Sequence, residues 1–454
     1  MAQRALTKVL PLRTAVSTSA GLASAAVNFL ATVDVAMYVG GRSAWLAILV
    51  AGALIVLTAS NFSELNGLFP SAAAIRVWTR RGLNDRLSLA ASLVYATTVV
   101  FVIAADAFVL AHVFQAAIPA VPGILWVVVI LGVTALFNLR GVRVAGLVQD
   151  TNAFVLLGTL SVISIMVIAN GPAMPVASLF HLGPRWIQGV ALGVFIFVGF
   201  EWVSPLAEEF QDARAIPRGM YMALGLIAMA FGLFALAVAD VFPNPTSLAS
   251  SLVPQLVVGQ RALGPWGFWW MAGVTLTTAM TTFNGGLVSA SRFVYALARE
   301  RSLPRSWARL NARLVPARAL LGLTALALVL ALMVYATKQY TLLIDAGAGV
   351  ESLMYALTTI LIIQLRRREP NRPRPYRAFG YPVLPVVVGL VFVGLATGAL
   401  TTPTTPAGTP WALIFVLGLT AAATIYVMFG LPRKRRASKR PTRSLGKVDK
   451  SPKA

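Results

Sequence analysis

The segment that decides the fold reads Gly193-Val-Phe-Ile-Phe-Val-Gly-Phe-Glu-Trp-Val-Ser-Pro-Leu-Ala-Glu-Glu209. It places a glycine, a carboxylate and a proline inside an apolar run. Every backbone N–H and C=O in hydrocarbon needs a partner, so this pattern predicts a helix that breaks where it lines a cavity. We expect a ligand-binding site formed in part by Phe197, Gly199, Phe200 and Glu201. The alternative is a Pro-kinked helix in which these residues only pack against neighbouring helices.

The composition is that of a polytopic, all-α membrane protein. The 454 residues are 58% hydrophobic and 12% charged, with a mean hydropathy of +0.78. A span needs about 20 apolar residues. The apolar segments predict twelve spans, near residues 16–39, 43–65, 88–118, 122–139, 146–170, 186–207, 219–242, 266–300, 319–337, 341–365, 381–401 and 409–430.

Composition also excludes several functional classes. The chain has no cysteine, and its two histidines, His112 and His181, are far apart in sequence, so we expect no metal centre. It has no phosphate-binding Gly-rich loop and no cluster of catalytic side chains typical of a membrane enzyme. The net charge of +23 lies mainly between apolar spans, where it sets topology. We therefore expect no cofactor, no enzymatic activity and no nucleic-acid partner.

Lys and Arg also predict the orientation. With the N-terminus inside, only four of the 38 basic residues lie outside, namely Arg42, Arg185, Arg261 and Lys338. The positive-inside rule then predicts a multi-pass protein of the cell membrane, plasma or inner, with both termini cytoplasmic. Residues 1–15 form the cytoplasmic N-terminus, residues 431–454 a basic disordered tail, and the basic clusters contact anionic membrane lipids.

Three stretches resemble the permeases of the amino acid-polyamine-organocation superfamily. The first is Phe197-Val-Gly-Phe-Glu201, followed by Ala-Glu-Glu and Ile-Pro-Arg. The second is Ser63-Glu-Leu-Asn-Gly-Leu-Phe-Pro-Ser-Ala-Ala73, and the third is Ser291-Arg-Phe-Val-Tyr-Ala-Leu-Ala-Arg-Glu-Arg-Ser-Leu-Pro304. They occur in the order and at the separations seen in that family.

This resemblance implies a leucine-transporter-type core of two inverted five-helix repeats, residues 16–170 and 186–365. Residues 381–430 would add two further helices. The first helix of each repeat is expected to be broken near the midplane, where its exposed ends bind a polar substrate.

Span one departs from the pattern of the resembled family. Relatives usually carry Gly-x-Gly where this chain has Ala25 and its neighbours, so the loop that usually binds a carboxylate has changed. Small residues still allow close approach of the backbone. The expected substrate-binding residues here are Ser24, Ala25, Ala26 and Asn28, and Asn28 could instead bind the broken backbone. The alternative is packing of small residues between helices.

Coupling candidates lie in three spans. Asp106 lies well inside the apolar run of span three, and we expect it to contact a substrate amine or carry a proton. The alternatives are a structural hydrogen-bond anchor or a position nearer the outer surface. Glu201 is a second proton candidate. A lysine that some relatives carry in span five has no counterpart near residues 156–158. Hydroxyls of span eight could instead bind Na⁺ against span one, namely Thr277, Thr278 and Thr281. Coupling by H⁺, by Na⁺ or by exchange without either ion remains open.

The function predicted from these features is a secondary transporter for an amino acid or related amine, acting by alternating access. The alternatives are a polyamine or organic-amine transporter or exchanger, and a non-transporting membrane sensor. The partners expected are the small-molecule substrate and membrane lipids, and the sequence gives no oligomeric state. A cavity that holds unpaired carboxylates should accept cationic or zwitterionic amines and reject dicarboxylates. The acids expected within spans are Asp34, Asp106, Glu201, Asp345 and Glu351.

Overall fold

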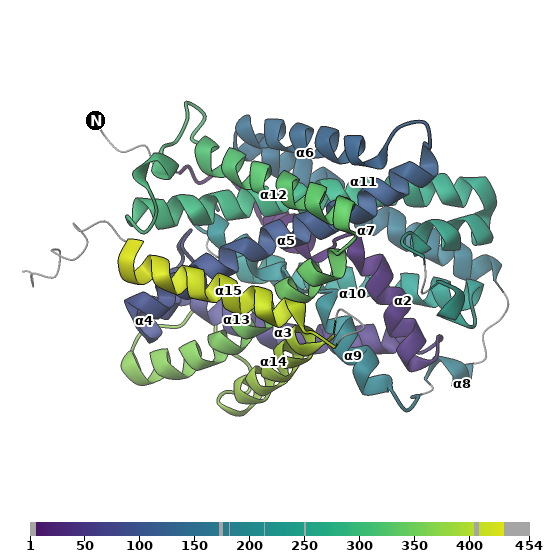
Figure 1. Cartoon of the computed structure of the whole chain (residues 1–454). Helices are drawn as coiled ribbons and strands as arrows, with labels where there is room; N and C mark the ends of the chain where they lie inside the picture. The colour runs from purple at the N-terminus through teal and green to yellow at the C-terminus, as the bar shows by residue number, and fades with distance from the viewer. Residues whose placement is uncertain are drawn as a thin grey trace, which may run out of the picture.

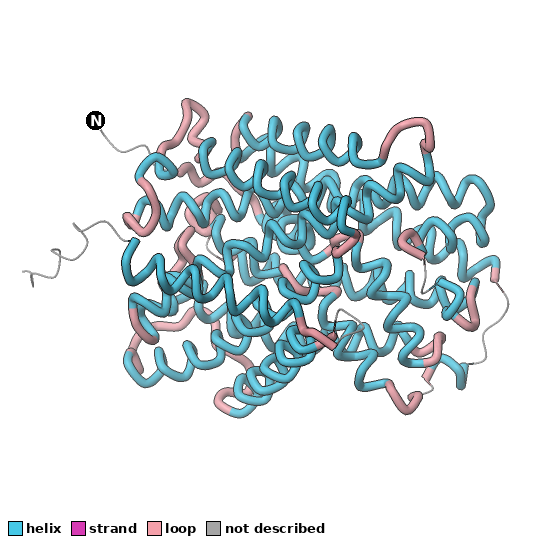
Figure 2. The backbone as a smooth tube through the Cα atoms, in the orientation of Figure 1, coloured by secondary structure: helices cyan, strands magenta, loops and turns pink. Residues whose placement is uncertain are grey.

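The computed structural model describes residues 6–171, 176–180, 182–212, 214–248, 251–403 and 408–430. His181 and the predicted disordered tail, residues 431–454, lie outside these ranges. Helices make up the described regular structure, and the long ones run roughly along one common direction (Figures 1 and 2). The only strand-like pairing in the described residues is an isolated bridge between Leu10 and Phe210.

The helices are longer and more often broken than hydropathy alone would give. Their bounds are α1 Leu12–Ala23, α2 Val27–Val39, α3 Ala44–Leu68, α4 Ile75–Gly82, α5 Asp85–Ala117, α6 Gly123–Leu139, α7 Val142–Asn170, α8 Val176–Leu179, α9 Trp186–Phe195, η1 Phe200–Leu206, α10 Ala215–Val241, η2 Pro245–Leu248, α11 Pro254–Arg299, η3 Arg305–Ala308, α12 Ala317–Thr337, α13 Tyr340–Arg368, α14 Val383–Thr401, α15 Trp411–Ile425 and η4 Tyr426–Gly430.

The predicted spans all have a helical counterpart. Nine described segments are long and apolar enough to cross a membrane, and the bent pair α1 and α2 makes a tenth. The remaining two predicted spans correspond to α6, a shorter apolar helix, and to α11. The range of α11, Pro254–Arg299, contains two helices that meet at a kink at Gly264, whose φ of +61° is not helical and is readily adopted by glycine. The second helix follows this kink, close to residue 266, where span eight was predicted to begin.

Burial separates central helices from peripheral ones. In the most apolar part of α5, 78% of residues are buried, against 22% in the span formed by α15 and η4. Figure 1 shows α15 lying across the surface of the bundle beside α14. Apolar side chains that remain exposed on such helices, including Leu390 and Leu417, are the surface expected to face lipid. Groups that act on a polar ligand therefore belong on the central helices.

A buried ion cluster joins α3 to the segment after α13. Glu64 is fully buried and accepts hydrogen bonds from Arg366 at 2.6 Å and Arg374 at 3.1 Å. It also accepts the amide of Ala378 at 2.7 Å. Three donors satisfy a carboxylate that would otherwise be costly to bury. The acidic residue of the second family-like stretch is therefore a structural anchor.

Replacing Glu64 should destabilise the fold strongly. We expect Glu64→Ala to lower the free energy of unfolding by about 3–5 kcal/mol, because both arginines lose a buried counter-ion. Glu369→Ala is the matched control, since Glu369 forms partly exposed pairs with Arg372 and Arg81 and should cost about 0–1 kcal/mol. Thermal unfolding of the two variants in one detergent measures the difference, and equal losses would contradict this role for Glu64.

Candidate functional site

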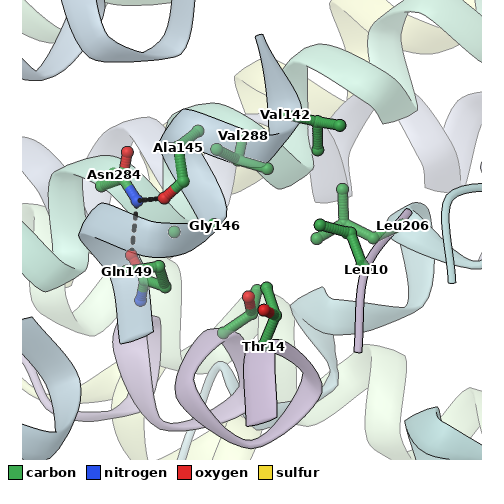
Figure 3. Close-up of a pocket in the computed structure, with 11 residues that line it drawn as sticks. Leu10, Thr14, Val142, Ala145, Gly146, Gln149, Leu206, Asn284 and Val288 are labelled. Atoms are coloured by element: carbon green, nitrogen blue, oxygen red, sulfur yellow. Dashed lines mark hydrogen bonds between the residues drawn. The ribbon is translucent and has the colours of Figure 1, made fainter. Parts of the chain in front are cut away.

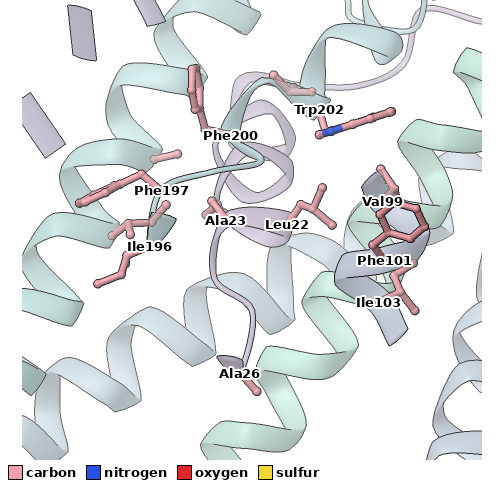
Figure 4. Close-up of a cluster of buried hydrophobic side chains, with 14 of the residues drawn as sticks. Leu22, Ala23, Ala26, Val99, Phe101, Ile103, Ile196, Phe197, Phe200 and Trp202 are labelled. Carbon is pink, nitrogen blue, oxygen red and sulfur yellow. The ribbon is translucent and has the colours of Figure 1, made fainter. Parts of the chain in front are cut away.

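Two broken helices meet in the middle of the bundle. α1 and α2 are bent by 64° across residues 24–26, which are not helical. α9 ends at Phe195, and η1 begins at Phe200, so four residues separate the two elements. α1 packs against η1 and α2 against α9, so the two breaks lie side by side (Figure 4). Both predicted breaks are confirmed, although the role of the predicted site residues as substrate ligands stays a prediction.

Gly199 makes the second break possible. Its φ of +105° lies in the left-handed region that other residues rarely adopt. A Cβ at this position would lie 3.2 Å from the side chain of Leu22 on α1. Its amide donates to the hydroxyl of Tyr355 at 3.1 Å. The glycine thus allows both the turn and the close approach of the two breaks.

Asn28 satisfies the free carbonyls at both breaks. Its side-chain amide donates to the carbonyl of Ala23 at 2.7 Å and to the carbonyl of Ile196 at 3.0 Å. These carbonyls belong to the ends of α1 and α9, which cannot complete their helical bonds. The sequence left open whether Asn28 binds a ligand or the broken backbone, and in this structure it binds the backbone.

The side chain of Asp106 on α5 binds the backbone at the start of α2. The fully buried carboxylate of this α5 residue accepts the backbone amide of Ala26, the residue preceding α2. This contact matches the structural anchor considered as its alternative role. The other carboxylate oxygen, Oδ2, has no hydrogen-bond donor among the described residues, and neither has the buried hydroxyl of Ser24. The break therefore keeps two unpartnered polar atoms. Ala25, which is also buried, is the middle residue of the non-helical segment between α1 and α2.

Glu201 is held by two tyrosines from different helices. It is buried on η1, where Oε1 accepts the hydroxyl of Tyr95 on α5 at 2.9 Å. Oε2 accepts the hydroxyl of Tyr355 on α13 at 2.5 Å. Since Tyr355 also binds the amide of Gly199, one hydroxyl connects the carboxylate to the helix break. The arrangement joins the broken span to two helices that are continuous.

A second buried carboxylate, Glu351 on α13, interacts electrostatically with Glu201. Its Oε1 accepts Thr98 at 2.6 Å and the indole N–H of Trp202 at 3.0 Å. Two ionised carboxylates have only acceptors, so a hydrogen bond between them requires one proton. The other oxygen of Glu351, Oε2, has no hydrogen-bond donor among the described residues. Glu201 and Glu351 are hereafter called the carboxyl pair.

Sequence reasoning missed Glu351 as a site residue because its depth within the span was unclear. A usable signal was present: Glu351 and Tyr355 are four residues apart and so lie on one face of a helix. Two hydrogen-bonding side chains on one face of a central helix indicate a buried polar contact. The sequence did not show that this contact is with span six.

The aromatic candidates on the broken span are packing residues in this structure. Phe197 is buried and lies 3.1 Å from the position that a Cβ on Gly52 would take. Phe200 packs against Phe62 and Tyr355, with ring centroids 5.6 and 5.7 Å apart. These contacts fix the turn around Gly199.

The hydroxyls proposed for sodium are engaged within their own helix. Thr277 and Thr278 donate to the carbonyl of Val274, and Thr281 donates to that of Thr277, all at 2.7–2.8 Å. Thr282, which was not predicted, bridges to α1 through the carbonyl of Gly21 at 3.3 Å. The predicted meeting of spans one and eight is thus present, whereas sodium binding there stays a prediction.

Gln149 of α7, another residue that sequence reasoning missed, fills the space beside this contact. Its amide donates to the carbonyl of Ser17 at 3.0 Å and accepts from Asn284 at 2.8 Å. A small hollow of about 200 Å³ of empty space lies next to it, lined in part by Thr14 (Figure 3). Among the described residues, no group of three His, Asp or Glu side chains could hold a metal ion.

Ion pairs connect the segment after η1 to the end of α11. Glu208 pairs with Arg299 at 2.5 Å, and buried Glu209 pairs with Arg292 at 3.0 Å. Burial alone would raise the pKa of Glu208, but the bonds from Arg299 and the Ala72 amide outweigh it and lower the pKa below its ordinary value. The segment carries the predicted Ala-Glu-Glu motif and closes the end of the bundle where the basic residues gather.

Comparison with known proteins supplies a family. A sequence model of the family described as amino acid permease matches residues 15–441. An uncharacterized transporter of Mycobacterium tuberculosis is 27% identical over 384 residues, covering 80% of this chain and 84% of the relative. The human large neutral amino acids transporter small subunit 2 is 27% identical over 354 residues, covering 72% and 64%. The mouse Asc-type amino acid transporter 1 is 30% identical over 223 residues, covering 47% and 38%.

Gly199→Val should abolish any transport that depends on the break. The β-branched side chain would occupy a left-handed backbone and press against Leu22, at a cost of about 1–3 kcal/mol. Gly225→Val is the matched control, because no atom lies within 4 Å of the position a Cβ would take on Gly225 of α10. Membrane insertion and uptake are measured for both. Unchanged uptake by the Gly199→Val protein would contradict the prediction that the break at Gly199 is part of the substrate site.

Proposed function

The chain belongs to the amino acid permease family, and from this premise we propose that it transports an amino acid or related amine by alternating access. The observation that carries the proposal is the meeting of two broken helices at the middle of a membrane bundle. Broken helices expose backbone donors and acceptors only where protein or a bound ligand can satisfy them. No enzymatic chemistry is needed to explain this arrangement.

The moving parts in this proposal are α1 and η1. Both pack against α11, and residues after η1 are held by the Glu208–Arg299 and Glu209–Arg292 pairs. Opening toward that face requires these pairs to separate. We place this face in the cytoplasm, with both termini on it, because the basic residues gather there. The membrane is the cell membrane, plasma or inner.

Uptake by purified protein in liposomes tests the function. Labelled neutral amino acids are tested first, because one relative is named a large neutral amino acids transporter and another an Asc-type amino acid transporter. Small amines and polyamines follow, with pH and sodium gradients imposed separately. We expect saturable uptake of at least one member and no uptake of glutamate. Ligand binding without flux would contradict transport and favour the sensor.

We further propose that the coupling ion is a proton bound by the carboxyl pair. No basic side chain among the described residues hydrogen-bonds to either acid, and the contacting titratable groups are Tyr95 and Tyr355. Three charged residues on helices that pack against η1 are paired elsewhere: Glu64 with Arg366, Arg292 with Glu209, and Arg13 with Asp150. A proton shared by the two carboxyl groups would stabilise the contact between η1, α5 and α13.

Glu351→Gln should separate exchange from coupling. The glutamine amide supplies a permanent donor to Glu201, so the contact no longer needs a proton. We expect counter-substrate exchange to persist, while uptake driven by an imposed pH gradient falls to the level without a gradient. Asp345→Asn on the same helix is the control and should keep gradient-driven uptake. Wild-type uptake driven by counter-substrate alone, and insensitive to both ion gradients, would refute the proton proposal.

A further inference from the structure

The two kinds of backbone group that could hold a zwitterion at the break already have partners within the chain. The start of a helix carries free N–H groups and a partial positive charge, which favour a carboxylate. At α2 this place is taken by Asp106, whose buried carboxylate binds the Ala26 amide. A substrate carboxylate at this position would compete with Asp106 for the same donor and would be repelled by its charge.

The carbonyl ends at the break are occupied as well. Free carbonyls at the end of a broken helix can bind an ammonium group. Here the side-chain amide of Asn28 donates to both Ala23 and Ile196, at 2.7 and 3.0 Å. Asn28 and Asp106 thus bind the broken backbone in place of an ammonium and a carboxylate.

Two polar groups remain without a partner at the break, a carboxylate oxygen that accepts and a hydroxyl that can donate or accept. Asp106 Oδ2 and Ser24 Oγ are buried and have no hydrogen-bond partner among the described residues. Thr282 approaches Asp106, yet its hydroxyl donates to the carbonyl of Gly21. No basic side chain in the described part of the chain pairs with Asp106. A buried carboxylate that lacks a cation attracts one, and its unpaired oxygen accepts an N–H.

From this geometry we infer that the site takes a protonated amine that has no carboxylate and that this amine binds through Asp106. The carboxylate of Asp106 supplies the negative charge that a zwitterionic amino acid would otherwise carry itself. The inference rests on the proposed transport function and narrows its substrate class. An α-amino acid would place its own carboxylate beside Asp106, where the hydroxyl of Ser24 is the added donor and no added positive charge offsets the repulsion. The decarboxylated amine keeps the ammonium and removes this conflict.

Binding can be tested apart from transport. The thermal unfolding temperature of the purified full-length protein is measured in detergent with increasing concentrations of an amino acid or of the amine formed by its decarboxylation. The three matched pairs of ligands are alanine and ethylamine, leucine and 3-methylbutylamine, and phenylalanine and 2-phenylethylamine. In at least one pair we expect the amine to bind about tenfold or more tightly than the amino acid, as expected for one charge-assisted hydrogen bond. Equal or tighter binding of the amino acid in every pair that binds, or no shift by any amine, would overturn the inference.

Substitutions identify the acceptor. Asp106→Asn keeps an oxygen for the Ala26 amide but removes the charge, so the amine preference should disappear. Asp106→Ala frees the start of α2 and should shift the preference toward the amino acid. Asp34→Asn, a change of an exposed acid on α2, is the control and should keep the wild-type preference. An amine preference that survives in folded Asp106→Asn would also overturn the inference.

Measuring uptake distinguishes a failure of this inference from a failure of the proposed transport function. Uptake of the three amines into liposomes is measured with the same protein preparation. Amines that bind through Asp106 without being taken up would contradict transport and leave the binding inference standing. Uptake of amino acids with no amine preference would support transport and reject the inference.

Discussion

Every backbone polar group inside the bilayer must be bonded, and the structure depends on how this constraint is met at two helix breaks. Asn28 satisfies carbonyls of both α1 and α9, Asp106 accepts the amide before α2, and Tyr355 accepts the amide of Gly199. These three side chains come from α2, α5 and α13. The breaks are therefore stabilised by helices on several sides, and a movement of one break changes the hydrogen bonding of the others.

This bonding joins the break at Gly199 to the carboxyl pair. Tyr355 binds both Gly199 at the break and Glu201 within η1, at 3.1 and 2.5 Å. A ligand that rearranges the turn at Gly199 must also move a donor of Glu201. If the two carboxyl groups share a proton, as proposed, its loss would leave two interacting negative charges buried in the bundle. Substrate and proton would thus act on one hydrogen-bonded unit, which is the physical requirement for coupling.

Sequence predicted the parts of this fold that depend on local pattern. Apolar length located the spans, and Gly199, Glu201 and Pro205 within one apolar run predicted the break in span six. The bond from Trp202 to Glu351 joins residues 149 positions apart, and that from Gln149 to Ser17 joins residues 132 apart. Such partners follow from tertiary packing rather than helix periodicity. The candidate acids were therefore recognisable as buried, whereas their pairing was not.

The ion pairs at the basic end of the bundle set the condition for movement. Arg292 and Glu209 are both buried, and the amides of Val9 and Leu10 donate to the Glu209 carbonyl. Separating a buried pair without solvent would leave two uncompensated charges, so opening must admit water to both side chains together. A ligand can favour that opening only through tighter binding to the open state. Glu201 lies near the start of η1, and Glu209 follows its end by three residues. A displacement of η1 caused by binding at the break would therefore move Glu209 directly, through the covalent chain.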